Sequence, residues 1–201
     1  MKRLLIATDG NMYVDSLTRA VICLLLDIGM RAHELCSLKL TDTHVVPARV
    51  KLSLGKGGKT SMLGFGTATR QALDAYLQSC AQLPERHDDT LLLNSHGKRI
   101  TERNLDRLLK SYSRRAGIAP VSAHMFRVTF AVEQFLNGAS LRAVQTALRH
   151  SSVDMAVHYM RLAEQERVAL SCAMTSVIDG LEVTQTTDTI EKVPTAGSIS
   201  S

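Results

Sequence analysis

The chain has 201 residues, 45% of them hydrophobic, and a formal net charge of +5, which is typical of one globular domain with its own core. Its longest apolar run, Ala20–Leu26, is far shorter than the roughly 20 residues that span a bilayer, and the cysteines form no Cys-x-x-Cys pair. These features argue against a membrane protein, a disulfide framework and a zinc site, so we expect a cytoplasmic protein without a metal. The charge permits a nucleic-acid partner, although an ordinary mildly basic surface explains it equally well.

The first part of the chain is expected to form helices around one β-hairpin. Gly29 follows a run of helical apolar periodicity in the manner of a helix C-cap. The glycines of residues 55–58 supply the positive-φ positions of a hairpin turn, so Lys56 is expected on that turn. In chain order we expect a lead-in over residues 1–13, a helix over 14–28, a short helix from about 30, strands over 49–54 and 61–65, and a helix over 67–80.

The second part is expected to be almost entirely helical. Gly117 and Gly138 end two of its helices. Beyond Gly180 large apolar residues become rare, which predicts a disordered tail over 182–201 after a domain that covers 14–181. The expected elements are an extended piece over 90–94 and helices over about 101–116, 123–137, 141–148, 153–161 and 164–178. The fold class is therefore mainly α with a small antiparallel β-sheet (α+β).

A dispersed set of side chains provides the groups for phosphoryl transfer on nucleic acid. A tyrosine hydroxyl can form a covalent phosphoester, and its phenolate can leave again in the reverse step. Arginines bind the non-bridging oxygens bidentately and stay protonated, while histidine and lysine transfer protons. Each residue alone is explained by an ordinary surface or core position, but these explanations give no reason for the set as a whole. The set is Arg31, Lys56, His124, Arg127, His150 and Tyr159.

The order of these residues and their local motifs resemble the catalytic domain of the tyrosine recombinase (phage integrase) family. The resemblance covers about Val14 to Ile178 and implies the DNA breaking–rejoining catalytic fold. The motifs are Ile28-Gly-Met-Arg-Ala-His-Glu-Leu-Cys-Ser-Leu38, Leu54-Gly-Lys-Gly-Gly-Lys59, Ala123-His-Met-Phe-Arg-Val-Thr-Phe-Ala131, and Ala147-Leu-Arg-His-Ser-Ser152 followed by Tyr159.

By this resemblance the protein is a site-specific recombinase or integrase that acts on double-stranded DNA as a homo-oligomer, a tetramer in the synapse, without a metal or other cofactor. Tyr159 is the implied nucleophile, which forms a 3′-phosphotyrosyl link. The other implied roles are phosphate binding by Arg31 and Arg127, proton transfer by His124, a hydrogen bond to the phosphate from His150, protonation of the 5′ oxygen by Lys56, and support of the site by Glu34. Lys59 is a rival of Lys56 for the lysine role.

The chain departs from the family pattern at three points. Val128 stands where the family usually has histidine, and Arg149 stands where it usually has glycine, which adds bulk and charge beside the site. The family also places a helical DNA-clamping domain before this region, whereas about thirteen residues precede the first predicted core helix. Two alternative functions therefore stay open: a truncated or non-recombining DNA-binding remnant, and a type IB topoisomerase-like enzyme. The topoisomerase is disfavoured because that family usually has lysine in place of His124.

A positive stripe is predicted on the helix over residues 101–116. Its members follow helical spacing of three and four, so they share one face. A solvated surface and contact with the DNA backbone explain this stripe about equally well. Together with Lys59, the candidate DNA-binding residues are Arg103, Arg107, Lys110 and Arg114.

Overall fold

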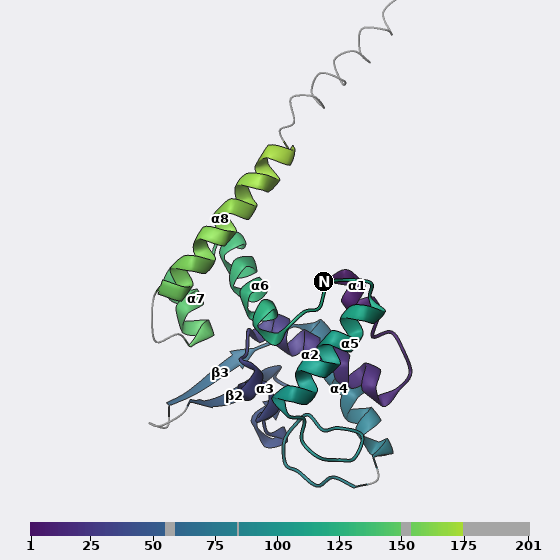
Figure 1. The fold of residues 1–201 in the computed structure, drawn as a ribbon. Coiled ribbons are helices and arrows are strands. Elements are labelled where there is room, and N and C mark those ends of the chain that lie inside the picture. Colours follow the sequence, from purple (N-terminus) through teal and green to yellow (C-terminus); the bar gives the residue numbers. More distant parts are fainter. Residues whose placement is uncertain (55–58, 84, 150–153, 175–201) are drawn as a thin grey trace, which may run out of the picture.

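The computed structural model describes residues 1–54, 59–83, 85–149 and 154–174, which form a mainly helical body with a small three-stranded sheet (Figure 1). This architecture confirms the predicted fold class. The elements are α1 (Lys2–Ile6), α2 (Tyr13–Ile28), α3 (Ala32–Cys36), η1 (Leu40–Asp42), β1 (Thr43–His44), β2 (Arg49–Leu54), β3 (Lys59–Gly64), α4 (Thr67–Ser79), η2 (Cys80–Gln82), α5 (Glu102–Arg115), α6 (Ala123–Leu136), α7 (Leu141–Leu148) and α8 (Asp154–Met174).

Helix α2 lies at the centre of the body. Val21, Ile22, Leu24 and Leu25 follow one another closely and are all fully buried, because α2 packs against α4 on one side and α6 on another. A helix that is apolar nearly all round must be covered on most faces. The helix ends at Gly29, whose left-handed φ of 63° turns the chain toward α3.

The sheet is antiparallel, with strand order β1-β2-β3. Val50 pairs with Leu63, and Leu52 pairs with Ser61. Val50 and Leu52 are buried while Lys51 between them is exposed, which is the alternation that the sequence predicts. The predicted hairpin strands are therefore confirmed, and the turn over residues 55–58 lies outside the described residues.

Two helices differ from the expectation. The predicted helices over 153–161 and 164–178 are one continuous helix, α8, which contains no glycine or proline and buries Ala163 at the expected break. Helix α8 reaches away from the rest of the body (Figure 1). Within the expected lead-in over residues 1–13, α1 forms and buries Leu4 completely. Residues 90–94 make only isolated bridges, and the predicted tail lies outside the described residues.

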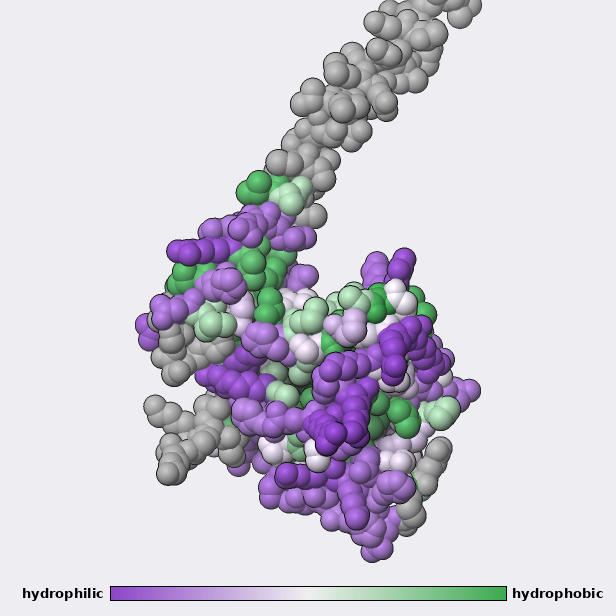
Figure 2. All heavy atoms as spheres, in the orientation of Figure 1, coloured by the Kyte–Doolittle hydropathy of each residue, from purple (hydrophilic) through white to green (hydrophobic). Residues whose placement is uncertain are grey.

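The described residues form two separate hydrophobic cores. The larger core is shared by α1 to α5 and the start of α6, and the smaller core is formed by α6, α7 and α8. Figure 2 shows apolar side chains gathered where α8 lies beside α6, and a mostly hydrophilic surface over the lower part of the body. Within the described part of the chain, no helix combines the length and apolar character that a membrane span requires.

Candidate active site

Arg127 lies on α6 and is buried between the two cores. Only 3% of the residue is exposed, and its guanidinium donates to the carbonyl of Gly29 at the end of α2 and to that of Leu148 at the end of α7. Burial, together with the nearby charges of Arg31 and Arg149, lowers the pKa of Arg127 to about 10. The side chain therefore remains protonated at neutral pH and links three helices through main-chain acceptors.

Gly29 allows this close approach. Its φ lies in the left-handed region, and a Cβ there would stand 2.5 Å from Cδ1 of Phe130 and 3.0 Å from Cδ2 of Leu148. Glycine is thus required both by the backbone conformation and by the space available. The absence of a side chain lets the end of α2 lie directly against α6 and places the carbonyl of Gly29 within reach of Arg127.

Arg31 stands immediately before α3 and is held by Glu34 one turn later. The Arg31 N–H donates to Oε2 of Glu34 at 2.8 Å, and Nη1 of Arg31 donates to Oε1 at 3.0 Å. Nη2 of Arg31 donates to the main-chain carbonyl of Arg149 at 3.4 Å. The Arg31 side chain stays 38% exposed, so it remains accessible to a ligand from outside.

Arg149 contributes a third guanidinium, which we did not predict as a site residue. Its Nη2 donates to Oε2 of Glu34 at 2.5 Å, and its Nε donates to Oε1 at 3.3 Å. The signal in the sequence was its replacement of the family glycine before His150, which we interpreted only as added bulk and charge. The contact with Glu34 joins residues 115 positions apart, so no local pattern predicts it.

We call Arg31, Arg127, Arg149 and Glu34 the arginine cluster. Burial alone would raise the pKa of Glu34, but hydrogen bonds from Arg149 and from the Arg31 backbone lower it below its ordinary value, so the carboxylate is ionised at neutral pH. Arg31 and Arg149 share this carboxylate, while Arg127 donates to main-chain carbonyls, so the cluster carries an excess of positive charge. Such a cluster is suited to bind a phosphate, which presents several anionic oxygens at once.

Tyr159 lies on α8 in the smaller core, beside the arginine cluster. Only 1% of the residue is exposed, and its neighbours in this core include Phe130, Phe135 and Leu148. Burial raises the pKa of the Tyr159 hydroxyl, while the charges of Arg127 and Arg31 act in the opposite direction. The structure therefore brings the candidate nucleophile within electrostatic range of both candidate phosphate-binding arginines of the same chain.

His124 lies in the first turn of α6, one turn before Arg127. It is exposed and lines a cavity of about 230 Å³ together with Ala32, which follows Arg31, and with Leu105 and Asp106 of α5. Ala32 and His124, the chain neighbour of Arg31 and the residue one turn before Arg127, thus line the same cavity. Lys56 and His150 lie outside the described residues, so their roles stay predictions.

The predicted positive stripe is exposed along α5, at Arg103, Arg107, Lys110 and Arg114. Lys110 is paired with Asp106 at 2.8 Å, which reduces its free charge. Asp106 also lines the cavity of His124, so one side of the stripe adjoins that cavity. Lys59 is the first residue of β3 and its backbone pairs with Leu54. Contact of these residues with DNA remains a prediction.

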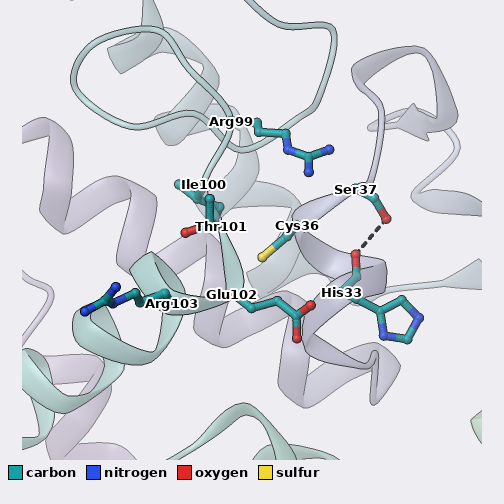
Figure 3. A pocket seen from close by; sticks show the side chains of 8 residues that line it. All are labelled: His33, Cys36, Ser37, Arg99, Ile100, Thr101, Glu102 and Arg103. Carbon is teal, nitrogen blue, oxygen red and sulfur yellow. Dashed lines mark hydrogen bonds between the residues drawn. The ribbon is translucent and has the colours of Figure 1, made fainter.

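A larger cavity, of about 490 Å³, opens between α3 and the start of α5 (Figure 3). Arg99 and Arg103 lie at its edges, and the buried Cys36 and Ile100 form its apolar part. Burial raises the pKa of the Cys36 thiol to about 11, so the thiol is neutral and a poor nucleophile. In the described ranges no three His, Cys, Asp or Glu side chains are grouped as metal ligands would be.

Comparison with known proteins identifies the family of this chain. The model of the phage integrase family matches residues 1–166. Tyrosine recombinase XerC of Staphylococcus carnosus is 34% identical over 149 residues, which are 74% of this chain and 50% of the relative. The crystal structure of XerA recombinase superposes with a TM-score of 0.74 at 26% identity, covering 85% of this chain and 62% of that one.

A pre-cleavage complex of XerH site-specific recombinase with its difH substrate superposes with a TM-score of 0.67 at 26% identity, covering 82% of this chain and 49% of that one. The chain spans about half the length of the curated relative that it matches. The family match extends over most of the chain and includes the elements that carry the arginine cluster and Tyr159. The chain therefore belongs to the phage integrase family.

Proposed function

We propose that this chain is the catalytic part of a site-specific DNA recombinase that cleaves and rejoins double-stranded DNA through Tyr159. The observation that carries this proposal is the placement of Tyr159 beside Arg31 and Arg127, within a positively charged cluster. Among the solved structures that this chain resembles, the XerH recombinase is bound to its difH substrate. A DNA phosphate is the ligand that fits both the charge and the nucleophile.

In the proposed reaction Tyr159 attacks the scissile phosphorus. The Tyr159 oxygen forms a bond to phosphorus, the bond from phosphorus to the 5′ oxygen breaks, and a 3′-phosphotyrosyl ester remains. Arg31 and Arg127 neutralise the charge that develops on the non-bridging oxygens. His124 accepts the phenol proton, and Lys56 gives a proton to the departing 5′ oxygen. The new ester conserves the energy of the broken bond, so the reverse attack rejoins DNA.

Burial sets the state of the nucleophile before the reaction. The raised pKa keeps Tyr159 protonated at neutral pH, so the resting site does not carry a reactive phenolate. The opposing charges of Arg127 and Arg31 favour the phenolate once a base removes the proton. We therefore propose that deprotonation accompanies attack, which is the role given to His124, with His150 bonded to the phosphate.

The DNA-binding surface is proposed to extend from the arginine cluster along α5. Arg103, Arg107 and Arg114 present exposed guanidinium groups on one face of that helix, and the cavity beside His124 adjoins this face. Contact of these groups and Lys59 with backbone phosphates would release counterions and make binding salt-dependent. We further propose a homo-oligomeric, tetrameric synapse on DNA and a cytoplasmic location at the nucleoid.

A covalent trap tests the proposed function. A library of nicked DNA duplexes with randomised sequence around the nick is incubated with the chain, and adducts are resolved by denaturing electrophoresis and sequenced. We expect adducts that share a sequence, and their loss in Tyr159→Phe. DNA binding without any adduct would instead identify a non-recombining remnant. Relaxation of supercoiled plasmids that lack the selected sequence would support the topoisomerase alternative.

The general acid is tested with a modified leaving group. A 5′-bridging sulfur leaves as a thiolate, which needs no protonation because a thiol is far more acidic than an alcohol. We expect the Lys56→Ala variant to cleave the ordinary duplex far more slowly than the parent. It should cleave the sulfur-substituted duplex at nearly the parental rate. If the sulfur-substituted duplex instead restores cleavage by the Lys59→Ala variant and not by Lys56→Ala, Lys59 is the general acid.

A further inference from the structure

Arg149 ends α7 in a backbone conformation that glycine usually occupies. Its φ is 55°, and it is the sole non-glycine residue with a positive φ in the described part of the chain. A left-handed residue at a helix C-terminus is ordinarily glycine because a Cβ crowds the neighbouring carbonyl. An arginine keeps such a conformation only where its other contacts outweigh the steric cost.

The side chain of Arg149 makes these contacts inside the protein. Only 3% of the side chain is exposed. Nε and Nη2 donate to the two carboxylate oxygens of Glu34 at 3.3 and 2.5 Å, and Nη1 donates to the carbonyl of Ala147 at 2.8 Å. Every guanidinium nitrogen thus has an acceptor. A lysine at this position could keep the charge but not the two-point contact.

The Glu34 carboxylate that accepts from Arg149 also accepts from Arg31 and orients it. Oε1 of Glu34 accepts from Nη1 of Arg31 at 3.0 Å, and Oε2 accepts from the Arg31 backbone N–H at 2.8 Å. The orientation of Glu34 is therefore set from two sides, by α3 and by the end of α7. The main-chain carbonyl of Arg149 also accepts from Nη2 of Arg31 at 3.4 Å.

The contact also affects the charge of the cluster. If Glu34 were paired with Arg31 alone, the carboxylate would neutralise most of the charge that Arg31 offers to a phosphate. Because Arg149 shares the carboxylate, part of the charge of Arg31 stays available. Arg149 itself is buried and fully engaged, so it is not available to contact DNA.

We propose that Arg149 is a positioning residue for DNA cleavage, which acts through Glu34 to hold Arg31 in its phosphate-binding orientation. This inference rests on the proposed function. A residue that acts in this way controls the cleavage rate once DNA is bound, and contributes little to the strength of DNA binding. It also loses its effect when Glu34 can no longer accept a charged hydrogen bond.

The test measures the rate of adduct formation by the full chain on the duplex selected from the nicked library, as a function of DNA concentration. We expect Arg149→Gly to lower the rate at saturating DNA about tenfold or more, with a half-saturating concentration within about twofold of the parent. The rate of Arg149→Lys at saturating DNA should lie between the rates of the parent and of Arg149→Gly. Arg142→Gln, on the exposed side of the same helix, is the matched control and should react like the parent.

A double-mutant cycle separates positioning from a merely structural role. In the Glu34→Gln background, Arg149→Gly should cost less than about twofold in rate. Equal rate losses in both backgrounds, or a single variant within twofold of the parent, would overturn the positioning role while leaving the proposed function intact. A parent chain that forms no adduct refutes the proposed function and this role with it. If Arg149→Gly does not fold, as shown by its thermal transition, Arg149→Lys provides the same comparison.

Discussion

The two hydrophobic cores of this chain differ in size and hold different residues of the proposed site. The larger core contains fully buried aliphatic side chains such as Leu24 and Leu25 and holds α3, which contains Glu34 and follows Arg31 directly. The smaller core contains fewer residues and includes Tyr159 itself. In the proposed reaction Arg31 stays in place to bind the phosphate, whereas Tyr159 leaves its buried surroundings to attack the phosphorus. Small cores open locally at a lower free-energy cost, so the difference in size matches this difference in role.

The arginine cluster lies where the two cores meet. Arg127 donates to the end of α2 and to the end of α7, and Arg149 connects the end of α7 to α3. Buried charged hydrogen bonds therefore link the two cores, beside the apolar packing of α2 against α6. Changes in the cluster should alter how the cores are joined, and changes within the smaller core should remain in that core.

Removal of the Arg127 guanidinium should have the largest effect. Arg127→Met leaves two buried carbonyls without their donor, so we expect the free energy of unfolding to fall by about 3 kcal/mol. Adduct formation should fall by about 1,000-fold or more because a proposed phosphate ligand is lost as well. Urea denaturation and the covalent trap measure the two effects. Arg127→Lys, which retains the charge, should lose less of both; an Arg127→Met chain as stable as the parent would contradict the proposed linkage.

Truncation of one buried side chain in each core should show whether the two cores unfold as separate units. Leu25→Ala removes a fully buried side chain from the larger core and should cost about 3 kcal/mol of global stability, whereas Val144→Ala in the smaller core should cost about 2 kcal/mol. Amide hydrogen exchange should increase across the whole protein for Leu25→Ala and chiefly in α6, α7 and α8 for Val144→Ala. If Val144→Ala speeds exchange equally in α2, the cores are not separate units.

The approach of α2 to α6 is tested by a pair of glycines. Gly29→Ala places a Cβ against Phe130 at a positive φ, and we expect a loss of about 2–3 kcal/mol. Gly117→Ala is the matched control, because Gly117 has a φ of 64° but no atom near its Cβ position. It should cost only about 1 kcal/mol, the backbone part of the effect. Equal losses in thermal denaturation would show that the close packing at Gly29 contributes nothing.

The ion pairs of Glu34 predict a pH dependence of stability. The folded pKa of Glu34 lies below its ordinary value of 4.5, so its contribution is present above pH 4.5 and is lost as the pH falls through the folded pKa. Glu34→Gln should therefore flatten the decrease of stability below about pH 4.5 in acid denaturation curves. Asp89→Asn, at an exposed pair with Lys39, provides a control that should change the curve much less. An unchanged acid limb in Glu34→Gln would count against the buried pairing.

Neutralisation of the α5 stripe should change DNA affinity with the smallest effect on the fold. Arg107→Gln and Arg114→Gln should each reduce the slope of log affinity against log salt by about 1 while altering stability by less than about 0.5 kcal/mol. Arg70→Gln, exposed on α4, is the control. Fluorescence anisotropy over a salt series measures the slope. A slope that is unaffected by both stripe variants would assign the stripe to ordinary solvated surface.

Local patterns predicted most of the helices and the hairpin strands, because apolar periodicity and glycine caps act over a few residues. The motifs also selected Arg31, Arg127 and Tyr159 as candidate site residues, and the structure brings both arginines into electrostatic range of Tyr159. The continuity of α8 was missed because the apolar pattern shifts where Leu162 and Ala163 pack into the smaller core. The pairing of Arg149 with Glu34 was beyond prediction since it depends on the spatial meeting of two helix ends.

The acceptors of Arg127 are main-chain carbonyls, and this has a consequence for how the protein can change over time. Every amino acid at position 148 presents the same carbonyl, so substitutions there can vary the packing while the hydrogen bond to Arg127 persists. Alanine scanning would therefore record position 148 as a packing position alone. An amide-to-ester replacement of the following peptide bond weakens the carbonyl as an acceptor, and would reveal its part in the site after correction for the lost Arg149 N–H, which donates to the carbonyl of Thr146 at 3.0 Å. The acceptors of Arg127 thus depend on the path of the backbone and not on the identity of the side chains at those positions.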